Sequence, residues 1–279
     1  MHLLAAIPGA IVDGSTAIDL GQTAGDIVLL SAADSELAAF AAARAALGDD
    51  FPTLRLANLL RLGHNLSVDL YVEGVIAKAK LVVVRLLGGV GYWPYGIERI
   101  ATACRAGGIK FAVLPGDDQP DPSLVGIGTL PADATHRLWQ YCLQGGAENA
   151  LNGLRFAASL IGREEHWAEP APLLRAGLYW PGHDRPDLAA LRASWVPGAA
   201  VAAVVFYRAL VQAGDLAPID ALIAALLSRG LNPLPIYVTS LKDPVSAETV
   251  ASCFAEAAPS VVLNAVGFAV SSPGGRSEE

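Results

Sequence analysis

The stretch LVVVRLLGGVGYWPYGIERI (residues 81–100) contains the pattern on which the fold prediction depends. It begins with the apolar run 81–87, which is typical of a parallel strand buried on both faces. Gly88, Gly89 and Gly91 then mark a sharp turn, and a helical pattern follows from residue 96. A strand that passes directly into a helix is the repeating unit of parallel α/β sheets, so this stretch predicts such a sheet.

Strand-like and helix-like patterns alternate on both sides of this stretch. In the first part of the chain we predict strands at 26–31 and 80–87, a strand running into a loop over 109–122, and helices at 34–48, 64–79 and 96–106. Residues 131–162 instead show two amphipathic helices, and a proline-rich linker over 169–186 follows them. Beyond the linker we predict strands at 199–207, 231–238 and 259–270, with helices at 216–230 and 245–258 between them.

This organisation predicts an α/β protein with two flavodoxin- or Rossmann-like parallel-sheet modules and a helical insert between them. The first module covers 1–128, the helical insert and linker cover 129–171, and the second module covers 172–279. The second module has about three strong strands, which is fewer than a sheet usually contains. We therefore expect it to be truncated, with the chain as the front part of a longer protein.

The composition excludes several classes of function. Hydrophobic residues make up 53% of the chain and charged residues 16%, yet no apolar run reaches the ~20 residues needed to cross a membrane. The formal net charge of −8 argues against a nucleic-acid partner, because binding phosphates requires clustered Lys and Arg. Cys104, Cys142 and Cys253 are odd in number and far apart, which favours a reducing, cytoplasmic environment.

The familiar motifs for phosphate binding and catalysis are missing from the sequence. Gly89 and Gly91 match the start of a dinucleotide-binding fingerprint, but Pro94 stands where its third glycine is required. The sequence contains no ATP-binding P-loop, no Gly-x-Ser-x-Gly and no His-Glu-x-x-His. The histidines never recur four residues apart, so no helix presents a pair of them to a metal. We therefore predict no catalytic residue and no metal ligand in this chain.

Aromatic residues crowd the turn after the central strand. Tyr92, Trp93 and Tyr95 surround Pro94, and such side chains suit a flat ligand or an interface with another domain. His64 and Asn65 stand at the start of the preceding helix, where Asn65 could cap it and His64 could be a capping or packing residue. The predicted substrate-binding or inter-domain contact residues are His64, Asn65, Tyr92, Trp93, Tyr95 and Glu98.

Longer stretches carry a family resemblance. GGVGYWPYG (88–96) and RGLNPLPIYVTSLKDP (229–244), together with VVLNAVGFAVSSPGG (261–275), resemble the N-terminal part of large subunits of the CobN and magnesium chelatase H-subunit family. The resemblance covers the chain up to about Gly275, and the final RSEE looks foreign or truncated. Members of this family are much longer, and the residues expected to insert the metal lie outside this chain.

The resemblance implies a tetrapyrrole as substrate and a metal chelatase as the parent enzyme. A cobaltochelatase of this kind inserts cobalt(II) into hydrogenobyrinic acid a,c-diamide in cobalamin biosynthesis, and uses ATP with magnesium. It also implies companion chelatase subunits, among them an AAA+ ATPase. We expect this chain to bind no cofactor and to be inactive on its own. Two alternatives stay open: a magnesium chelatase subunit that acts on protoporphyrin IX, and a non-catalytic α/β module that binds or organises a partner.

Overall fold

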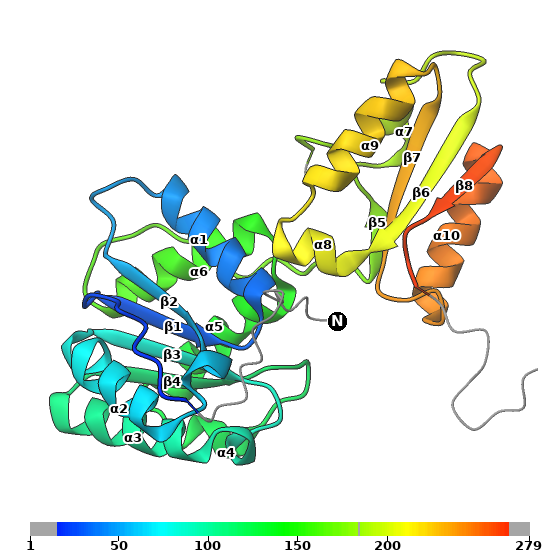
Figure 1. Cartoon of the computed structure of the whole chain (residues 1–279). Coiled ribbons are helices and arrows are strands. Elements are labelled where there is room, and N and C mark those ends of the chain that lie inside the picture. Colours follow the sequence, from blue (N-terminus) through cyan, green and yellow to red (C-terminus); the bar gives the residue numbers. More distant parts are fainter. Residues whose placement is uncertain (1–15, 184, 268–279) are drawn as a thin grey trace, which may run out of the picture. The chain divides into compact units, whose positions relative to one another are not determined.

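A computed structural model describes residues 16–183 and 185–267 of the chain. The chain consists of a first unit, which ends at Pro172, and a second unit, which begins at Leu173 (Figure 1). Both units are α/β folds, so the predicted fold class is confirmed. No helix in the described ranges is both long and apolar enough to span a bilayer.

The first unit contains a parallel sheet of four strands in the order β2-β1-β3-β4. Its strands are β1 (Ile27–Ser31), β2 (Leu54–Asn58), β3 (Leu81–Leu86) and β4 (Lys110–Pro115). Every residue of the two central strands β1 and β3 is buried, as the apolar runs predicted. A strand that is covered on both faces is predominantly apolar, so the buried polar residues Ser31 in β1 and Arg85 in β3 are the exceptions to be explained.

Helices cover both faces of this sheet (Figure 1). One face, with Val28, Val82 and Val113, packs against α2 and α3, and the other, with Leu29, Val83 and Leu114, packs against α1, α5 and α6. The two helices predicted as an insert therefore cover the first sheet. The helical elements are α1 (Asp34–Ala46), η1 (Leu59–Leu62), α2 (Asn65–Gly74), η2 (Ile76–Lys78), η3 (Val90–Tyr92), α3 (Pro94–Gly107), α4 (Pro122–Val125), α5 (Ala132–Gln144) and α6 (Ala147–Leu160).

An extended segment over 163–171, called the strap from here on, packs on α5 and α6. Buried Asn149 receives a hydrogen bond from the Ala171 N–H at 2.9 Å and donates one to the Ala171 carbonyl at 2.9 Å. Asn152 accepts a further bond from the Ala168 N–H at 3.1 Å, and Trp167 packs edge-on against Phe156. Because side-chain amides replace a strand partner for this backbone, the strap is fixed to the first unit.

The second unit contains a mixed sheet in the order β5-β7-β6-β8. Its strands are β5 (Ala176–Leu178), β6 (Val201–Tyr207), β7 (Asn232–Val238) and β8 (Val261–Asn264). Strand β5 runs antiparallel to β7, whereas the sequence predicted parallel strands alone and placed these residues in a linker. A strand of three residues with Gly177 at its centre is too short to show a strand pattern. Its partner in β7, Tyr237, occupies the space where a side chain at position 177 would lie.

Four helices surround this second sheet in the described part of the chain: α7 (Leu188–Arg192), α8 (Arg208–Ala213), α9 (Ala217–Ser228) and α10 (Pro244–Ala257). Helix α9 packs against β7, and α10 packs against β5 and β7. Strand β8 pairs only with β6 among the described strands, and Val261 and Val262 on it are exposed. Residues 268–279, which include the predicted tail, lie outside the described ranges.

Asp26, just before β1, links the amino ends of β1, β2 and β3 and makes stability depend on acid. Its carboxylate accepts hydrogen bonds from the Thr53 hydroxyl at 2.7 Å and the Thr53 N–H at 2.9 Å, and Lys80 lies 2.9 Å away. These contacts, led by the Thr53 hydroxyl, lower the pKa of Asp26 to about 2. Because the pKa of Asp26 is lower in the folded than in the unfolded chain, its ionised form stabilises the fold. This stabilisation is fully present above the unfolded-state pKa near 3.8 and is lost as the pH falls toward 2.

We therefore expect Asp26→Asn to lower the free energy of unfolding by about 2 kcal/mol at pH 6, and this difference from wild type to shrink between pH 4 and pH 2. Urea unfolding at several pH values measures it. Asp49→Asn, at an exposed turn position, serves as the matched control. A difference between wild type and Asp26→Asn that stays constant down to pH 2 would contradict the assignment.

Candidate functional site

A groove opens at the carboxyl ends of the strands in the first unit. Strand β1 is followed by α1 on one face of the sheet, and β3 is followed by α3 on the other, so the chain diverges between these neighbouring strands. Ligands of open parallel sheets bind at such points. The cavity here measures about 150 Å³ and is called the carboxyl-edge groove; it is lined by Ser31, Ala32, Ala33, Leu60, Arg85, Leu87, Tyr92 and Gly116.

Arg85 forms the floor of the groove. Its guanidinium forms an ion pair with Glu36 in the first turn of α1, and both side chains are about 10% exposed. It also donates to the carbonyl oxygens of Pro115 and Gly116, each at 3.1 Å. Burial lowers the pKa of Arg85, but Glu36 above all, together with Cys142 and Asp117, raises it, and the pKa stays above its ordinary value. Arg85 is therefore held as a cation in contact with the Glu36 side chain.

Ser31 and the half-buried Cys142 lie beside this ion pair. The Ser31 hydroxyl donates to Glu36 at 2.6 Å and accepts from the Ala33 N–H at 3.1 Å, so both of its functions are occupied. Burial, and next the Glu36 carboxylate, raise the pKa of the Cys142 thiol. Neither residue is an activated nucleophile, because Ser31 has no base that is free to accept its proton and Cys142 is held as a thiol.

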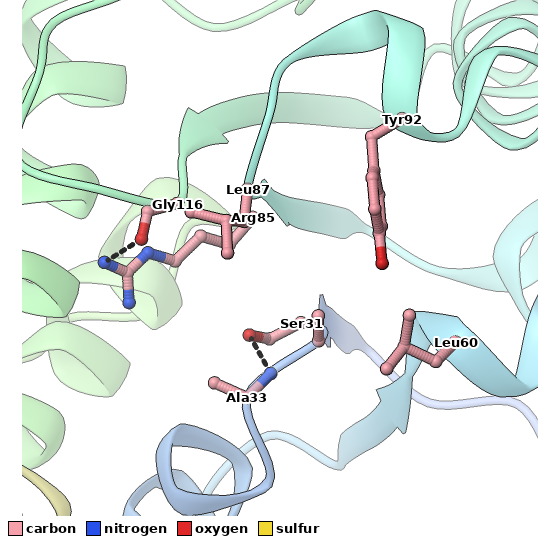
Figure 2. A pocket seen from close by; sticks show the side chains of 8 residues that line it. Ser31, Ala33, Leu60, Arg85, Leu87, Tyr92 and Gly116 are labelled. Carbon is pink, nitrogen blue, oxygen red and sulfur yellow. Dashed lines mark hydrogen bonds between the residues drawn. The ribbon is translucent and has the colours of Figure 1, made fainter. Parts of the chain in front are cut away.

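Tyr92 forms the upper wall of the groove. Figure 2 shows its ring pointing from the loop after β3 toward Ser31 and Leu60. The side chain is 54% exposed, and its hydroxyl makes no hydrogen bond within the described ranges. Leu87, on the same loop, is 43% exposed. The groove thus offers an aromatic face, apolar walls and one unengaged hydroxyl.

The neighbouring Trp93 has a structural role instead. It is buried, and its indole N–H donates to the Leu62 carbonyl at 3.0 Å. A Cβ on Gly96 would lie 2.0 Å from the indole ring, so the glycine creates the space in which the ring packs. Trp93 therefore joins the start of α3 to η1 and does not line the groove.

Tyr95 also joins helices. Its hydroxyl donates to the Asp69 carboxylate in α2 at 2.9 Å, and Arg99 donates to the same carboxylate at 2.7 Å. Arg99, followed by Tyr95, lowers the pKa of Asp69. These contacts fix α3 against α2 and hold the loop that carries Tyr92.

The other predicted contact residues lie outside the groove. His64 caps α2 by accepting the Leu66 N–H at its Nδ1 atom, at 3.1 Å, and Asn65 is the exposed first residue of the helix rather than its cap. Glu98 is exposed on α3. Of the six predicted residues, only Tyr92 lines the groove. Sequence reasoning missed Ser31, Glu36, Leu60, Arg85 and Leu87; the available signals were the arginine inside an apolar strand and the positions at strand ends.

A second cavity of about 290 Å³ lies between the loops that follow β3 and β4. Asp117 and Asp121 line it, but Asp121 is engaged as the cap of α4, where it accepts the Ser123 N–H at 3.0 Å. No group of three or more His, Cys, Asp or Glu side chains in the described ranges is arranged to hold a metal. This cavity therefore adds no metal centre to the groove.

The corresponding edge of the second unit is covered by its own chain. Arg208, just after β6, donates to the carbonyl oxygens of Leu173 and Leu174 at 3.0 and 2.9 Å. Thr239, just after β7, donates from its N–H and its hydroxyl to the Arg175 carbonyl, both at 2.8 Å. Residues 173–175 thus cross the strand ends where a ligand would bind.

The packing of Trp93 on Gly96 is testable by a pair of substitutions. Gly96→Ala is expected to lower the free energy of unfolding by about 1–3 kcal/mol, because the new methyl group displaces the indole. This steric cost exceeds the gain of up to about 1 kcal/mol that alanine brings inside a helix. Gly91→Ala is the control, since nothing lies within 4 Å of the added atom. Urea unfolding, monitored by tryptophan fluorescence, gives the free energy of unfolding of both variants. An equal loss of stability in Gly96→Ala and Gly91→Ala would contradict the packing of Trp93 on Gly96.

Comparison with known proteins identifies relatives of the whole chain. The family model described as CobN/Magnesium Chelatase matches residues 139–279. The chain is 48% identical to the aerobic cobaltochelatase subunit CobN of a Sinorhizobium species and 42% identical to that of Pseudomonas aeruginosa. In each case 98% of this chain and 22% of the relative are aligned, so the chain spans about a fifth of their length.

A solved structure agrees with this relationship. The catalytic subunit of cobaltochelatase from Mycobacterium tuberculosis superposes with a TM-score of 0.61 and 27% sequence identity, over 80% of this chain and 17% of that one. The family model matches just over half of the chain, and the two curated relatives extend the similarity through the first unit. The chain therefore belongs to the CobN/magnesium chelatase family.

Proposed function

We propose that the chain is the front part of the large subunit of an aerobic, ATP-dependent cobaltochelatase, which inserts cobalt(II) into hydrogenobyrinic acid a,c-diamide during cobalamin biosynthesis. The observation that carries this proposal is the 48% identity to a cobaltochelatase subunit over 98% of the chain, because it covers both units. The cobalt ion is substrate in this reaction. The residues that insert it belong to the part of the large subunit that this chain does not represent.

The choice of cobalt over magnesium rests on the relatives. The family model includes both kinds of chelatase, whereas both curated relatives are named as cobaltochelatase subunits. The sequence contains no P-loop, which favours ATP hydrolysis by companion subunits of the AAA+ type. A magnesium chelatase subunit acting on protoporphyrin IX is the second candidate, and the binding experiment below separates the two.

The role proposed for the first unit is to hold one edge of the tetrapyrrole in the carboxyl-edge groove. Pockets that enclose a drug-sized ligand measure about 300–1,000 Å³, and the groove measures about 150 Å³. A macrocycle therefore cannot be buried in it, but one edge with its substituents fits. Tyr92 offers its ring to the flat face of the ligand, and Leu60 and Leu87 supply the apolar walls.

Tryptophan fluorescence of the purified chain tests this role. Trp93 follows Tyr92 directly, and Trp139 donates its indole N–H to the Asp117 carbonyl at 3.2 Å, so both lie near the carboxyl edge. We expect saturable quenching by hydrogenobyrinic acid a,c-diamide in the micromolar range and weaker binding of protoporphyrin IX. Tyr92→Ala should weaken binding about 2- to 12-fold, which corresponds to the loss of one aromatic contact.

Leu66→Ala, an exposed position on α2 outside the groove lining, is the control and should bind as wild type does. Tighter binding of protoporphyrin IX would support the magnesium chelatase alternative. A folded, monodisperse chain that binds neither tetrapyrrole would overturn the role of the groove and favour a scaffolding part.

A further inference from the structure

The carboxyl edge of the second sheet carries more cations than acids. Arg208 follows β6 directly, Lys242 lies in the turn after β7, and Arg175 lies in the segment that crosses these strand ends. Asp243 lies in the same turn, but it forms an ion pair with Arg175 at 2.9 Å and also caps α10. Asp215 lies beyond the far end of α8 (Figure 1). This edge is therefore positively charged, although the whole chain has a formal net charge of −8.

Arg208 is a partly buried cation with no carboxylate partner in the described ranges. Its guanidinium donates to the carbonyl oxygens of Leu174 and Leu173 at 2.9 and 3.0 Å, and no described group accepts from its Nη1 atom. Burial lowers the pKa of Arg208, and repulsion from Arg175 adds to this effect, while Tyr237 offsets part of it. A cation that has lost hydration without gaining an anion is stabilised when a carboxylate approaches it.

Exposed apolar side chains accompany these cations. Leu174 is 57% exposed, Val245 is 52% exposed and Leu241 is 36% exposed. The segment 173–175 is joined to the turn after β7, because the Arg175 carbonyl accepts the Thr239 N–H at 2.8 Å. Leu241 lies in that turn and Val245 in the first turn of α10, so all three apolar side chains belong to one edge. This surface, called the cationic edge from here on, consists of Leu174, Arg175, Arg208, Leu241, Lys242 and Val245.

The composition of the cationic edge favours a polypeptide partner over a small ligand. Residues 173–175 cross the strand ends, where a small ligand of such a sheet would bind, so a partner must lie across this segment. A nucleic acid would use the cations alone, since its phosphates supply the affinity. A polypeptide that bears both carboxylates and apolar side chains uses the cations and the apolar residues together, as protein interfaces commonly do.

From these observations we infer that the cationic edge docks an acidic polypeptide segment that also carries apolar side chains. Arg208 and Lys242 pair with its carboxylates, and Leu174 and Val245 pack against its apolar side chains. The inference goes beyond the proposed function, because it concerns the second unit and a macromolecular partner rather than the tetrapyrrole. The surface contains fewer residues than the roughly 20–30 per side of a standard interface, so we expect weak, reversible and salt-sensitive binding.

Fluorescence anisotropy with synthetic peptides tests this inference on the purified chain. The probe is a fluorescein-labelled peptide of about twelve residues that mixes Glu and Leu, long enough to cover a small site. Its matched comparison replaces every Glu by Gln. We expect the wild-type chain to bind the acidic peptide at least about tenfold more tightly than the Gln peptide, and this preference to shrink as salt is added.

Two pairs of variants locate the binding surface. Lys242→Glu should weaken binding of the acidic peptide roughly fivefold, whereas Arg229→Glu makes the same charge change at the amino end of β7 and should leave it within about twofold. Leu174→Ser should also weaken binding roughly fivefold, whereas Val196→Ser, at an equally exposed position before β6, should not. Circular dichroism and urea unfolding check that all four variants fold as wild type does.

The outcomes decide the inference without reference to the tetrapyrrole, so its failure leaves the proposed function in place. Absence of saturable binding, or equal binding of the acidic and Gln peptides, would overturn it. Equal effects within either pair of variants would place the contact away from the cationic edge and would overturn it as well. Tighter binding of a single-stranded oligonucleotide than of the acidic peptide would replace the polypeptide by another class of partner. Weakening confined to Lys242→Glu and Leu174→Ser would establish the inference.

Discussion

The buried ion pair between Arg85 and Glu36 is the interaction on which the carboxyl edge of the first sheet depends. Arg85 lies in a strand that is otherwise apolar, and its guanidinium reaches the start of α1 and the turn after β4. Removing two charges from water is costly, and such a pair is tolerated when the remaining donors are satisfied. Here the Pro115 and Gly116 carbonyls accept from Arg85, and the Ser31 hydroxyl donates to Glu36. The strand ends are thereby fixed in position by polar contacts rather than by apolar packing alone.

Much of the architecture could be predicted from the sequence because buried parallel strands are apolar at nearly every position. The runs around Val28, Val83 and Val204 show this directly. Strand β5 could not be predicted in this way, since three residues of an edge strand carry no pattern of their own. The strap was equally hidden, because its partners are the side chains of Asn149 and Asn152, far away in the sequence.

The site was harder to predict than the fold for a physical reason. A cluster of aromatic residues does not show which ring turns inward: Gly96 makes space for Trp93, so the indole becomes part of the core and Tyr92 is left at the surface. Tyr95 and Asp69 form a contact between α2 and α3 that neither helix reveals alone. The walls of the groove come from four separate strand ends, which only the sheet order β2-β1-β3-β4 brings together.

The strap determines where the first unit can be separated from the rest of the chain. Asn149 and Asn152 are buried, and the strap supplies partners for their amide groups, so a fragment cut after α6 would leave those groups without the partners supplied by residues 168 and 171. The match to the family model begins at residue 139, inside α5, and therefore divides a structural unit in its middle. The structural unit is the first sheet with its covering helices and the strap, and it ends at Pro172, within one residue of the boundary that the sequence placed between linker and second module.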